Sequence, residues 1–289
     1  MMLRNDIRNV AIIAHVDHGK TTLIDALLRQ SHIFRDNQRV ADLVMDSNAL
    51  EREKGITIMA KNTAVSYGGV KINIIDTPGH ADFGGEVERV INMADGCLLL
   101  IDAVEGPMPQ TKFVLRQALD AGLTAIVIIN KVDRPYAKPD VALRLTQDLF
   151  LETATRAEQL DFPVLYASGK EGRVSTSPTI RGTNIAPLFE YILEHVPAPH
   201  IEDGPFQMLV SNLDYDNHKG KIAIGRIRRG SVKPRDTIVC IGADGSEMRF
   251  EVAEVLTHHG LNRVNARVAN AGDIVAITGP KQVAIGDTG

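Results

Sequence analysis

The chain has 289 residues, of which 44% are hydrophobic and 24% charged, and its formal net charge is −4. These values are ordinary for a soluble globular protein, and the length favours two domains. The slightly acidic balance gives no global attraction to nucleic acid, and we expect no DNA partner. No apolar run approaches the roughly 20 residues that span a bilayer, and the N-terminus lacks a signal-peptide core, so we expect a cytoplasmic protein without membrane contact.

The two cysteines, Cys97 and Cys240, each lie inside an apolar, strand-like run, and they are far apart in sequence. Free cysteine is among the most often buried residue types, and disulfides are rare in reducing compartments. We therefore expect two buried, reduced thiols rather than a disulfide.

Up to about Val196, short apolar runs alternate with amphipathic helical patterns, which is typical of a parallel sheet with crossover helices. The predicted strands are residues 10–14, 71–76, 97–102, 125–130 and 163–167. The predicted helices are residues 22–30, 83–93, 110–121, 139–149 and 185–195. The fold class expected for this part is an α/β, doubly wound, mostly parallel sheet, whose ligands bind at the carboxyl ends of the strands.

A cluster of Pro197, Pro199, Gly204 and Pro205 interrupts this pattern. After it the hydrophobic period changes to two, with predicted strands at residues 206–213, 221–227, 237–241, 247–256 and 274–278. Short strands separated by turn residues predict a small closed β-barrel. We therefore expect one domain at residues 1–197 and a second at residues 203–289.

The segment AHVDHGKT, residues 14–21, joins the first predicted strand to the first predicted helix. A glycine-rich loop in this position supplies backbone N–H groups for phosphate oxygens, a lysine charge and a hydroxyl for Mg²⁺. Ala14 departs from the general pattern, which has Gly there. The residues expected to contact the nucleotide are Asp17, His18, Gly19, Lys20, Thr21 and Thr22.

The segment DTPGH, residues 76–80, follows the second predicted strand. An acid at the end of a strand facing a phosphate loop typically holds Mg²⁺, which predicts this role for Asp76, through water. Gly79 allows a backbone N–H to approach a terminal phosphate closely. In isolation such a segment would be an ordinary turn, but its place after a phosphate loop favours the phosphate-sensing role.

The segment Asn130-Lys131-Val132-Asp133 ends another predicted strand. A carboxylate at Asp133 can accept two hydrogen bonds from guanine, whereas adenine would leave the buried charge unpaired. This disfavours an ATP-using enzyme. Ser168 and Gly169 end the next strand, and the backbone N–H of Gly169 is expected to point at O6 of guanine, although Ser-Gly alone is a common turn.

A long polar stretch, residues 31–61, separates the first helix from the strand that ends at Asp76. Long loops without periodicity are usually functional. Thr57 within it can give Mg²⁺ a second hydroxyl when a γ-phosphate is bound, which would couple loop order to the nucleotide state. The alternative is a merely disordered insertion.

These motifs, in this order, resemble those of the translational GTPases. The stretches MDSNALEREKGITIMAKNTAV, DTPGHADFGGEVERV and DAVEGPMPQT are similar to the BipA family, also called TypA, of bacterial ribosome-associated GTPases. The resemblance covers essentially the whole chain. Elongation factor G and LepA share the short motifs but match the segment DSNALE less well. Ala at position 14 is familiar in this group. The family continues beyond this length, so the chain is expected to be the N-terminal GTPase domain with its barrel.

The resemblance implies a role for each matching residue. Lys20 contacts the β- and γ-phosphates, Thr22 contacts the α-phosphate, and Asp17 helps to hold a monovalent cation. The implied magnesium ligands are Thr21, Thr57 and, through water, Asp76; the implied base pocket comprises Asn130, Lys131, Asp133 and Ser168. Val16 and Ile56 occupy the positions of an apolar gate beside the catalytic histidine.

His80 is the candidate catalytic residue. Phosphoryl transfer to water needs a positioned nucleophile, and an imidazole after Gly79 can orient or polarise that water. The alternative for an isolated histidine is an ordinary exposed side chain.

The expected function is GTP hydrolysis, used as a nucleotide switch in translation, ribosome assembly or stress adaptation, with GTP, GDP and Mg²⁺ as ligands. The expected partner is the ribosome, contacted through the barrel and through the family's further domains, and the protein is expected to be a monomer. One alternative is another translational GTPase. The other is a nucleotide-gated RNA-binding module, suggested by the basic run Lys219, Lys221, Arg226, Arg228, Arg229, Lys233 and Arg235.

Overall fold

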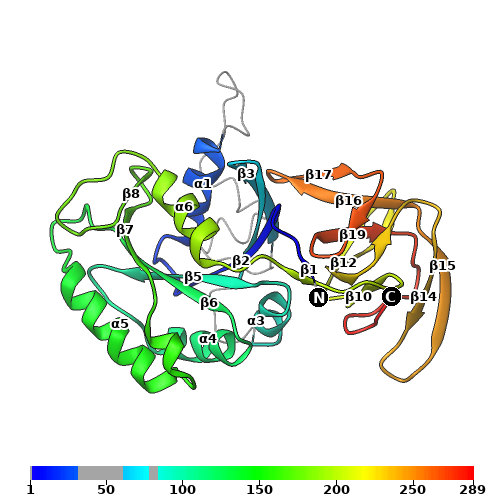
Figure 1. Ribbon diagram of the computed structural model, residues 1–289, viewed down its shortest axis with the longest axis horizontal. Helices are drawn as coiled ribbons and strands as arrows, with labels where there is room; N and C mark the ends of the chain where they lie inside the picture. Colours follow the sequence, from blue (N-terminus) through cyan, green and yellow to red (C-terminus); the bar gives the residue numbers. More distant parts are fainter. Residues whose placement is uncertain (1, 32–60, 78–83) are drawn as a thin grey trace. The chain divides into compact units, whose positions relative to one another are not determined.

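The computed structural model describes residues 2–31, 61–77 and 84–289, which form two compact units (Figure 1). The α/β unit is Arg8–Pro197. The β unit combines Ala198–Gly289 with the N-terminal Met1–Ile7.

A seven-stranded sheet forms the centre of the α/β unit, in the order β3-β4-β2-β5-β6-β7-β8. Its strands are β2 (Ile7–Ala14), β3 (Lys61–Tyr67), β4 (Val70–Asp76), β5 (Gly96–Asp102), β6 (Thr124–Asn130), β7 (Val164–Ser168) and β8 (Arg173–Ser175). The pairs β2–β5, β5–β6 and β6–β7 are parallel, whereas β3–β4 and β7–β8 at the two edges are antiparallel. The predicted doubly wound, mostly parallel sheet is confirmed.

Helices cover both faces of this sheet (Figure 1). They are α1 (Lys20–Gln30), α3 (Gly84–Ile91), α4 (Pro109–Asp120), α5 (Pro139–Thr153) and α6 (Ala186–His195), with a short 3-10 helix at Ala157–Leu160. In Figure 1, α1 and α6 lie on one side of the sheet and α3, α4 and α5 on the other. Every residue of β5 is buried, as expected for a strand covered on both faces. None of the helices in the described ranges is long and apolar enough to cross a membrane.

The strand β3 is absent from the sequence prediction. Its residues KNTAVSY are largely polar, yet all seven pair with β4 in continuous antiparallel register. An edge strand hydrogen-bonds on one side only and exposes part of its surface, so its sequence lacks the apolar run that marks a central strand.

The β unit consists of short antiparallel strands that curl into a barrel-like shape (Figure 1). They are β1 (Met2–Leu3), β9 (His200–Ile201), β10 (Gln207–Met208), β11 (Asn212–Asp216), β12 (Gly220–Arg229), β13 (Ser231–Val232), β14 (Thr237–Ile241), β15 (Glu247–Glu251), β16 (Glu254–His259), β17 (Asn262–Asn265), β18 (Ala269–Asn270) and β19 (Ile274–Thr278). Apolar side chains from β12, β14, β16 and β19 meet in one buried cluster.

Two predicted strands, residues 237–241 and 274–278, coincide with β14 and β19. The predicted strand 247–256 is instead two strands, β15 and β16. Between them, Val252 donates its N–H to Asp236 and Ala253 donates to Thr278, so the chain leaves one sheet and enters another. Val252 is buried, and the apolar alternation therefore continues across the break.

The first residues of the chain belong to the β unit, whereas the sequence pattern assigns them to the first domain. β1 pairs with β9, and Arg4 N–H donates to the carbonyl of Pro199. The Arg4 guanidinium also donates to the carbonyls of Asn270 and Ala271, at 3.0 and 2.8 Å. These contacts join the N-terminal segment to the second unit.

Both cysteines are free and buried, as expected. Burial raises the pKa of the Cys97 thiol to about 12. The thiolate is the reactive form of cysteine, so this thiol is inert at neutral pH.

Candidate functional site

The loop between β2 and α1 turns sharply at Gly19, whose φ is +91°. A Cβ built on Gly19 would lie 2.5 Å from the side-chain nitrogen of Asn130. Such a contact cannot be accommodated without moving Asn130, and the left-handed backbone adds strain for any L side chain. Only glycine fits this turn, which brings the loop against the end of β6.

The loop ends at the N-terminus of α1, which has no acidic residue in its first turn and no side-chain cap. The first backbone N–H groups of a helix lack intrahelical partners, and the helix dipole adds partial positive charge there. These groups, with the loop, form a suitable site for an anion such as a phosphate.

Lys20 is the buried cation of this loop. Its ammonium lies 2.9 Å from a carboxylate oxygen of Asp76 and also donates to the carbonyl of Thr77. Lys20 is 8% exposed and Asp76 is fully buried. The structure therefore brings two predicted site residues together, from α1 and from the end of β4.

Asn130, at the end of β6, joins three loops. Its side-chain nitrogen donates to the carbonyl of His18 at 2.8 Å, and its side-chain oxygen accepts from Gly169 N–H at 3.0 Å. The phosphate loop, the segment after β6 and the segment after β7 are thereby held together. This arrangement differs from the expectation for Gly169, because its N–H is turned toward Asn130 rather than left to meet a base.

Lys131 follows Asn130 in the left-handed region, with φ of +64°. Its ammonium lies 2.6 Å from Asp102 and donates to the carbonyl of Asp17 in the phosphate loop. Burial alone would raise the pKa of Asp102, but the hydrogen bonds from Lys131 and Val104 and the charge of Lys131 lower it overall. Asp133 lies exposed on the turn beyond, where its carboxylate is accessible to a ligand.

The ring of His18 is fully buried and faces β5 rather than a ligand. Its Nδ1 lies 3.3 Å from the carbonyl of Leu100, and its Nε2 lies 3.4 Å from the carboxylate of Glu105. Because a carbonyl only accepts, Nδ1 carries the proton of that bond. Burial lowers the pKa of His18. The backbone of His18 is engaged as well, since its N–H donates to the carbonyl of His15 at 3.2 Å and its carbonyl accepts from Asn130.

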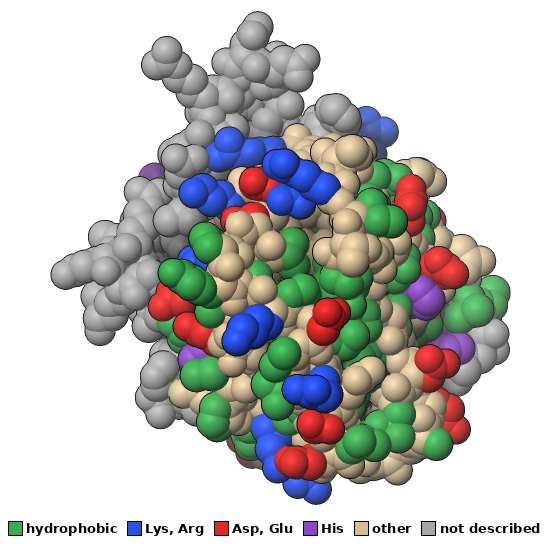
Figure 2. Space-filling view, turned by 90° about the vertical axis from the view of Figure 1, so that its left-hand side faces the viewer, with side chains coloured by type: hydrophobic (Ala, Val, Ile, Leu, Met, Phe, Trp, Pro, Cys, Tyr) green, Lys and Arg blue, Asp and Glu red, His purple; other side chains and the backbone are tan. Residues whose placement is uncertain are grey.

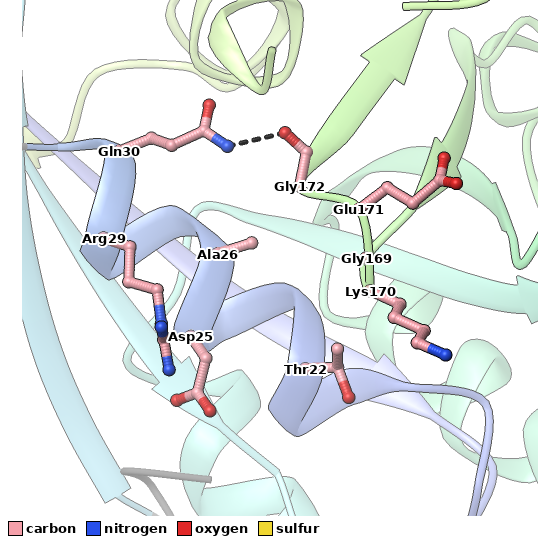
Figure 3. A pocket seen from close by; sticks show the side chains of 9 residues that line it. All are labelled: Thr22, Asp25, Ala26, Arg29, Gln30, Gly169, Lys170, Glu171 and Gly172. Atoms are coloured by element: carbon pink, nitrogen blue, oxygen red, sulfur yellow. Dashed lines mark hydrogen bonds between the residues drawn. The ribbon is translucent and has the colours of Figure 1, made fainter. Parts of the chain in front are cut away.

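Ser168, at the end of β7, is buried, and its hydroxyl accepts from Glu171 N–H at 3.3 Å. It shapes the turn that carries Gly169 and Lys170. Beside this turn lies a cavity of about 480 Å³ between α1 and residues 169–172 (Figure 3). Thr22 and Asp25 line it from α1, and at the far end the amide of Gln30 donates to the carbonyl of Gly172 at 2.6 Å.

Several predicted site residues lie outside the described part of the chain. They are Ile56, Thr57, Gly79 and His80. Val16, the other predicted gate residue, is described and half-buried. In the described ranges no three His, Cys, Asp or Glu side chains converge on a point where they could hold a metal.

Asp102 and Glu105 are site residues that sequence reasoning missed. Both lie at the carboxyl end of β5, between the predicted phosphate and base motifs. The sequence feature that could have indicated Asp102 is its position at the end of a buried strand, next to the strand that ends at Asn130.

The face of the α/β unit in Figure 2 carries basic, acidic and apolar side chains mixed together, with Lys and Arg gathered near its upper edge. This mixture agrees with the small net charge of the chain and gives this face no dominant sign.

The fold and the loops define a P-loop GTP-binding protein. Residues 5–198 match the family described as elongation factor Tu GTP binding domain, and residues 220–289 match elongation factor Tu domain 2. The chain belongs to this family of translation-factor GTP-binding domains.

More specific similarity is to BipA, as the sequence motifs indicated. The chain is 52% identical over 288 residues, 99% of its length, to "Large ribosomal subunit assembly factor BipA" of Salmonella typhimurium. It is 51% identical, over 99% of its length, to "Putative elongation factor TypA-like SVR3, chloroplastic" of Arabidopsis thaliana. The matched regions are 47% and 42% of those proteins, so the chain spans about half the length of these relatives.

A crystal structure of a protein from Thermus thermophilus has the same fold, with a TM-score of 0.74 at 20% identity. The match covers 99% of this chain and 54% of that one. Because it extends over both units of this chain, it supports the fold class described above.

Proposed function

We propose that the α/β unit binds GTP with Mg²⁺ and hydrolyses it to GDP and phosphate, acting as a nucleotide switch. The observation that carries the proposal is the side chain of Asn130, which holds the phosphate loop and the segment after β7 beside Lys131 and Asp133. One side chain thus connects the predicted guanine-binding segment to the phosphate-binding loop, as expected for a single nucleotide site.

The phosphates would lie over the loop and the first turn of α1. The backbone N–H groups from Gly19 to Thr21 offer donors, and that of His18 would join them by leaving the carbonyl of His15. Lys20 would be directed to the β- and γ-phosphates and Thr22 to the α-phosphate. Gly79 would add a backbone donor for the γ-phosphate. The ammonium of Lys20 already contacts the carboxylate of Asp76 and the carbonyl of Thr77. On nucleotide binding, phosphate oxygens would take the place of these two contacts.

The residues present fit a magnesium ion, because they offer hard oxygen ligands beside a phosphate cradle. Thr21 and Thr57 would ligate it directly, and the buried carboxylate of Asp76 would hold it through water. The ion neutralises charge on the phosphate oxygens. Asp76 is fully buried at the end of β4, beside the phosphate loop.

The base would lie beside Lys131, with the exposed carboxylate of Asp133 accepting the two guanine donors. Asn130 and Ser168 shape this pocket through the contacts described above. Gly169 lies beside α1: a Cβ there would be 3.4 Å from the backbone nitrogen of Leu23, an ordinary van der Waals distance.

For hydrolysis, His80 would orient the attacking water, and Val16 and Ile56 would flank it as an apolar gate. Asp17 would contribute to a monovalent cation site. A water-positioning residue is effective only when a partner fixes its geometry, so intrinsic turnover should be slow.

The partner that best fits is the ribosome, because the similar proteins are named as a ribosomal subunit assembly factor and a putative elongation factor. We infer two domains: a GTP domain that covers the predicted residues 1–197 apart from the first seven, and residues 203–289 as part of the ribosome interface. We also infer a cytoplasmic monomer that serves translation, ribosome assembly or stress adaptation.

The alternative, a nucleotide-gated RNA-binding module with incidental hydrolysis, receives less support from the basic run. Within it, Lys219 pairs with Glu254 at 2.8 Å, Lys221 donates to the carbonyl of Val283, and Arg226 is 8% exposed. The ion pair offsets the charge of Lys219, and burial withdraws Arg226 from the surface, so fewer positive charges of the run are left for a polyanion.

The test is a nucleotide panel. The wild-type chain should bind GDP and GTP far more tightly than ADP or ATP, and Asp133→Asn should shift preference from guanine to xanthine nucleotides. An unchanged preference in Asp133→Asn would refute the base-reading role. In the same assay, His80→Ala should keep GDP affinity and lose ribosome-stimulated turnover; retained turnover would remove His80 from catalysis.

A further inference from the structure

Asp102 is a buried carboxylate that the reaction just described does not use. It ends β5 and is 1% exposed. One carboxylate oxygen accepts from Val104 N–H at 2.7 Å, and the other lies 2.6 Å from the ammonium of Lys131. Both oxygens therefore have partners, and one partner is a residue of the proposed base pocket.

The sheet sets this contact. Asp102 is directly opposite Asn130 in the parallel register of β5 and β6, and Ala103 N–H donates to the carbonyl of Asn130 at 2.8 Å. Lys131, one residue on, turns back in the left-handed region. This conformation is uncommon for a residue other than glycine and persists only where the surroundings enforce it.

Lys131 connects Asp102 to the phosphate loop. Its ammonium donates to the carbonyl of Asp17, a second residue with positive φ, at +64°. A lysine side chain has several rotatable bonds and is costly to immobilise. A buried counter-ion at a fixed distance offsets that cost, and Asp102 is the carboxylate that contacts this ammonium.

Among the described residues, the titratable group of His18 also interacts with Asp102, and that of Glu105 interacts with His18. The ring of His18 contacts Glu105 and the carbonyl of Leu100 rather than Lys131. In the part of the chain that the structure describes, Lys131 is the cation whose ion pair joins Asp102 to the phosphate loop.

We propose that Asp102 is a positioning residue: it holds Lys131 in place and, through Lys131, couples the guanine pocket to the phosphate loop. The inference rests on the proposed function, since it assigns a role within that nucleotide site. It predicts that loss of the Asp102 charge accelerates nucleotide release without altering the step at the γ-phosphate.

The principal variant is Asp102→Asn, whose amide oxygen can still accept from Val104 while its charge is lost. Its matched control is Glu152→Gln, which breaks the exposed Lys112–Glu152 ion pair on the same unit, 2.7 Å in length. Stopped-flow release of a fluorescent GDP should be roughly tenfold to a hundredfold faster for Asp102→Asn, since breaking a buried ion pair is costly and an exposed pair contributes little. Release from Glu152→Gln should stay within about twofold.

Two further readouts separate positioning from general damage. In GTP hydrolysis, Asp102→Asn should raise KM and leave kcat at saturation within about twofold, because the γ-phosphate residues are untouched. In a Lys131→Met background, Asp102→Asn should add no further acceleration, because its partner is gone. If Asp102→Asn does not fold, Asp102→Ser, with a hydroxyl acceptor and no charge, replaces it in every arm.

Unchanged GDP release in a folded Asp102 variant would overturn the inference and leave the proposed function standing. A fall in kcat at constant KM, or effects that add fully in the Lys131→Met background, would also overturn it. A folded wild-type chain that fails to bind GDP would refute both the inference and the function on which it rests.

Discussion

At the scale of single residues, the site depends on a few positions that tolerate no substitute. Gly19 combines a left-handed backbone with a close approach to the Asn130 side chain. Asn130 in turn bonds to the loop before Gly19 and to Gly169. A change at either residue therefore disturbs the phosphate and base regions together.

Gly19→Ala should abolish measurable GDP binding, because a methyl group there must displace Asn130. The matched control is Gly69→Ala in the β3–β4 turn, with φ of +80° and nothing within 4 Å of the added Cβ. Both variants should lose about 1 kcal/mol of stability to backbone strain. Only Gly19→Ala should lose binding by isothermal titration. Equal GDP affinity in the two variants would contradict the steric argument.

At the scale of elements, α1 has an N-terminus that is poorly stabilised by its own sequence. It lacks both an acidic first turn and a side-chain cap, although helices usually gain from these features. Such a terminus is expected where the N–H groups serve an anionic ligand rather than the helix itself.

Thr22→Glu should therefore stabilise the nucleotide-free chain and weaken GDP binding. A glutamate in the first turn interacts favourably with the dipole, by about 0.3–1 kcal/mol, and should raise the nucleotide-free Tm by about 1–3 °C relative to Thr22→Gln. The same charge repels phosphate, so GDP should raise the Tm of Thr22→Gln and not that of Thr22→Glu. Thermal unfolding with and without GDP measures both effects. Similar stabilisation of the two variants by GDP would exclude a phosphate at this turn.

At the scale of the whole molecule, the β unit draws its strands from both ends of the chain. β1 at the N-terminus pairs with β9, and Arg4 donates to two carbonyls near β18. The N-terminal segment is thus part of the packing of a unit that otherwise begins at Ala198.

Arg4→Ala should loosen the β unit and spare the nucleotide site. Loss of two hydrogen bonds from a charged group should cost about 1–3 kcal/mol. Hydrogen–deuterium exchange should accelerate around residues 198–201 and 269–272, while GDP affinity stays that of the wild type. Lys112→Ala, which removes an exposed ion pair, is the control and should change neither. Exchange limited to the α/β unit would contradict the assignment of residues 1–7.

The sequence predicted the fold class and the central strands, because buried parallel strands are marked by continuous apolar runs. The edge strand β3 and the break between β15 and β16 were missed. β3 lies at the edge of the sheet, where a strand can be polar, so its sequence lacks the apolar run that marks a central strand. Val252 is buried at the break between β15 and β16, so the apolar alternation does not reveal that break.

At the site, motif order predicted that Asp76 ends a strand facing the phosphate loop, and its carboxylate is observed in an ion pair with Lys20. The partners of Lys131 and His18 could not be predicted in this way. Asp102 contacts Lys131 only because the register of β5 against β6 sets Asp102 opposite Asn130, and register is a property of the folded sheet. The hydrogen bond that Asn130 accepts from Gly169 N–H was not predicted either, for a similar reason.

The pairing of β1 with β9 makes the β unit discontinuous in sequence, with the α/β unit inserted between its first strand and the remainder. The polypeptide therefore crosses from one unit to the other twice, near residues 7–8 and 197–198. One protease cut at either crossing would leave the units covalently joined through the other. A recombinant fragment that starts at Ala198 would lack a native strand, and a barrel made for separate study should carry residues 1–7 fused ahead of it.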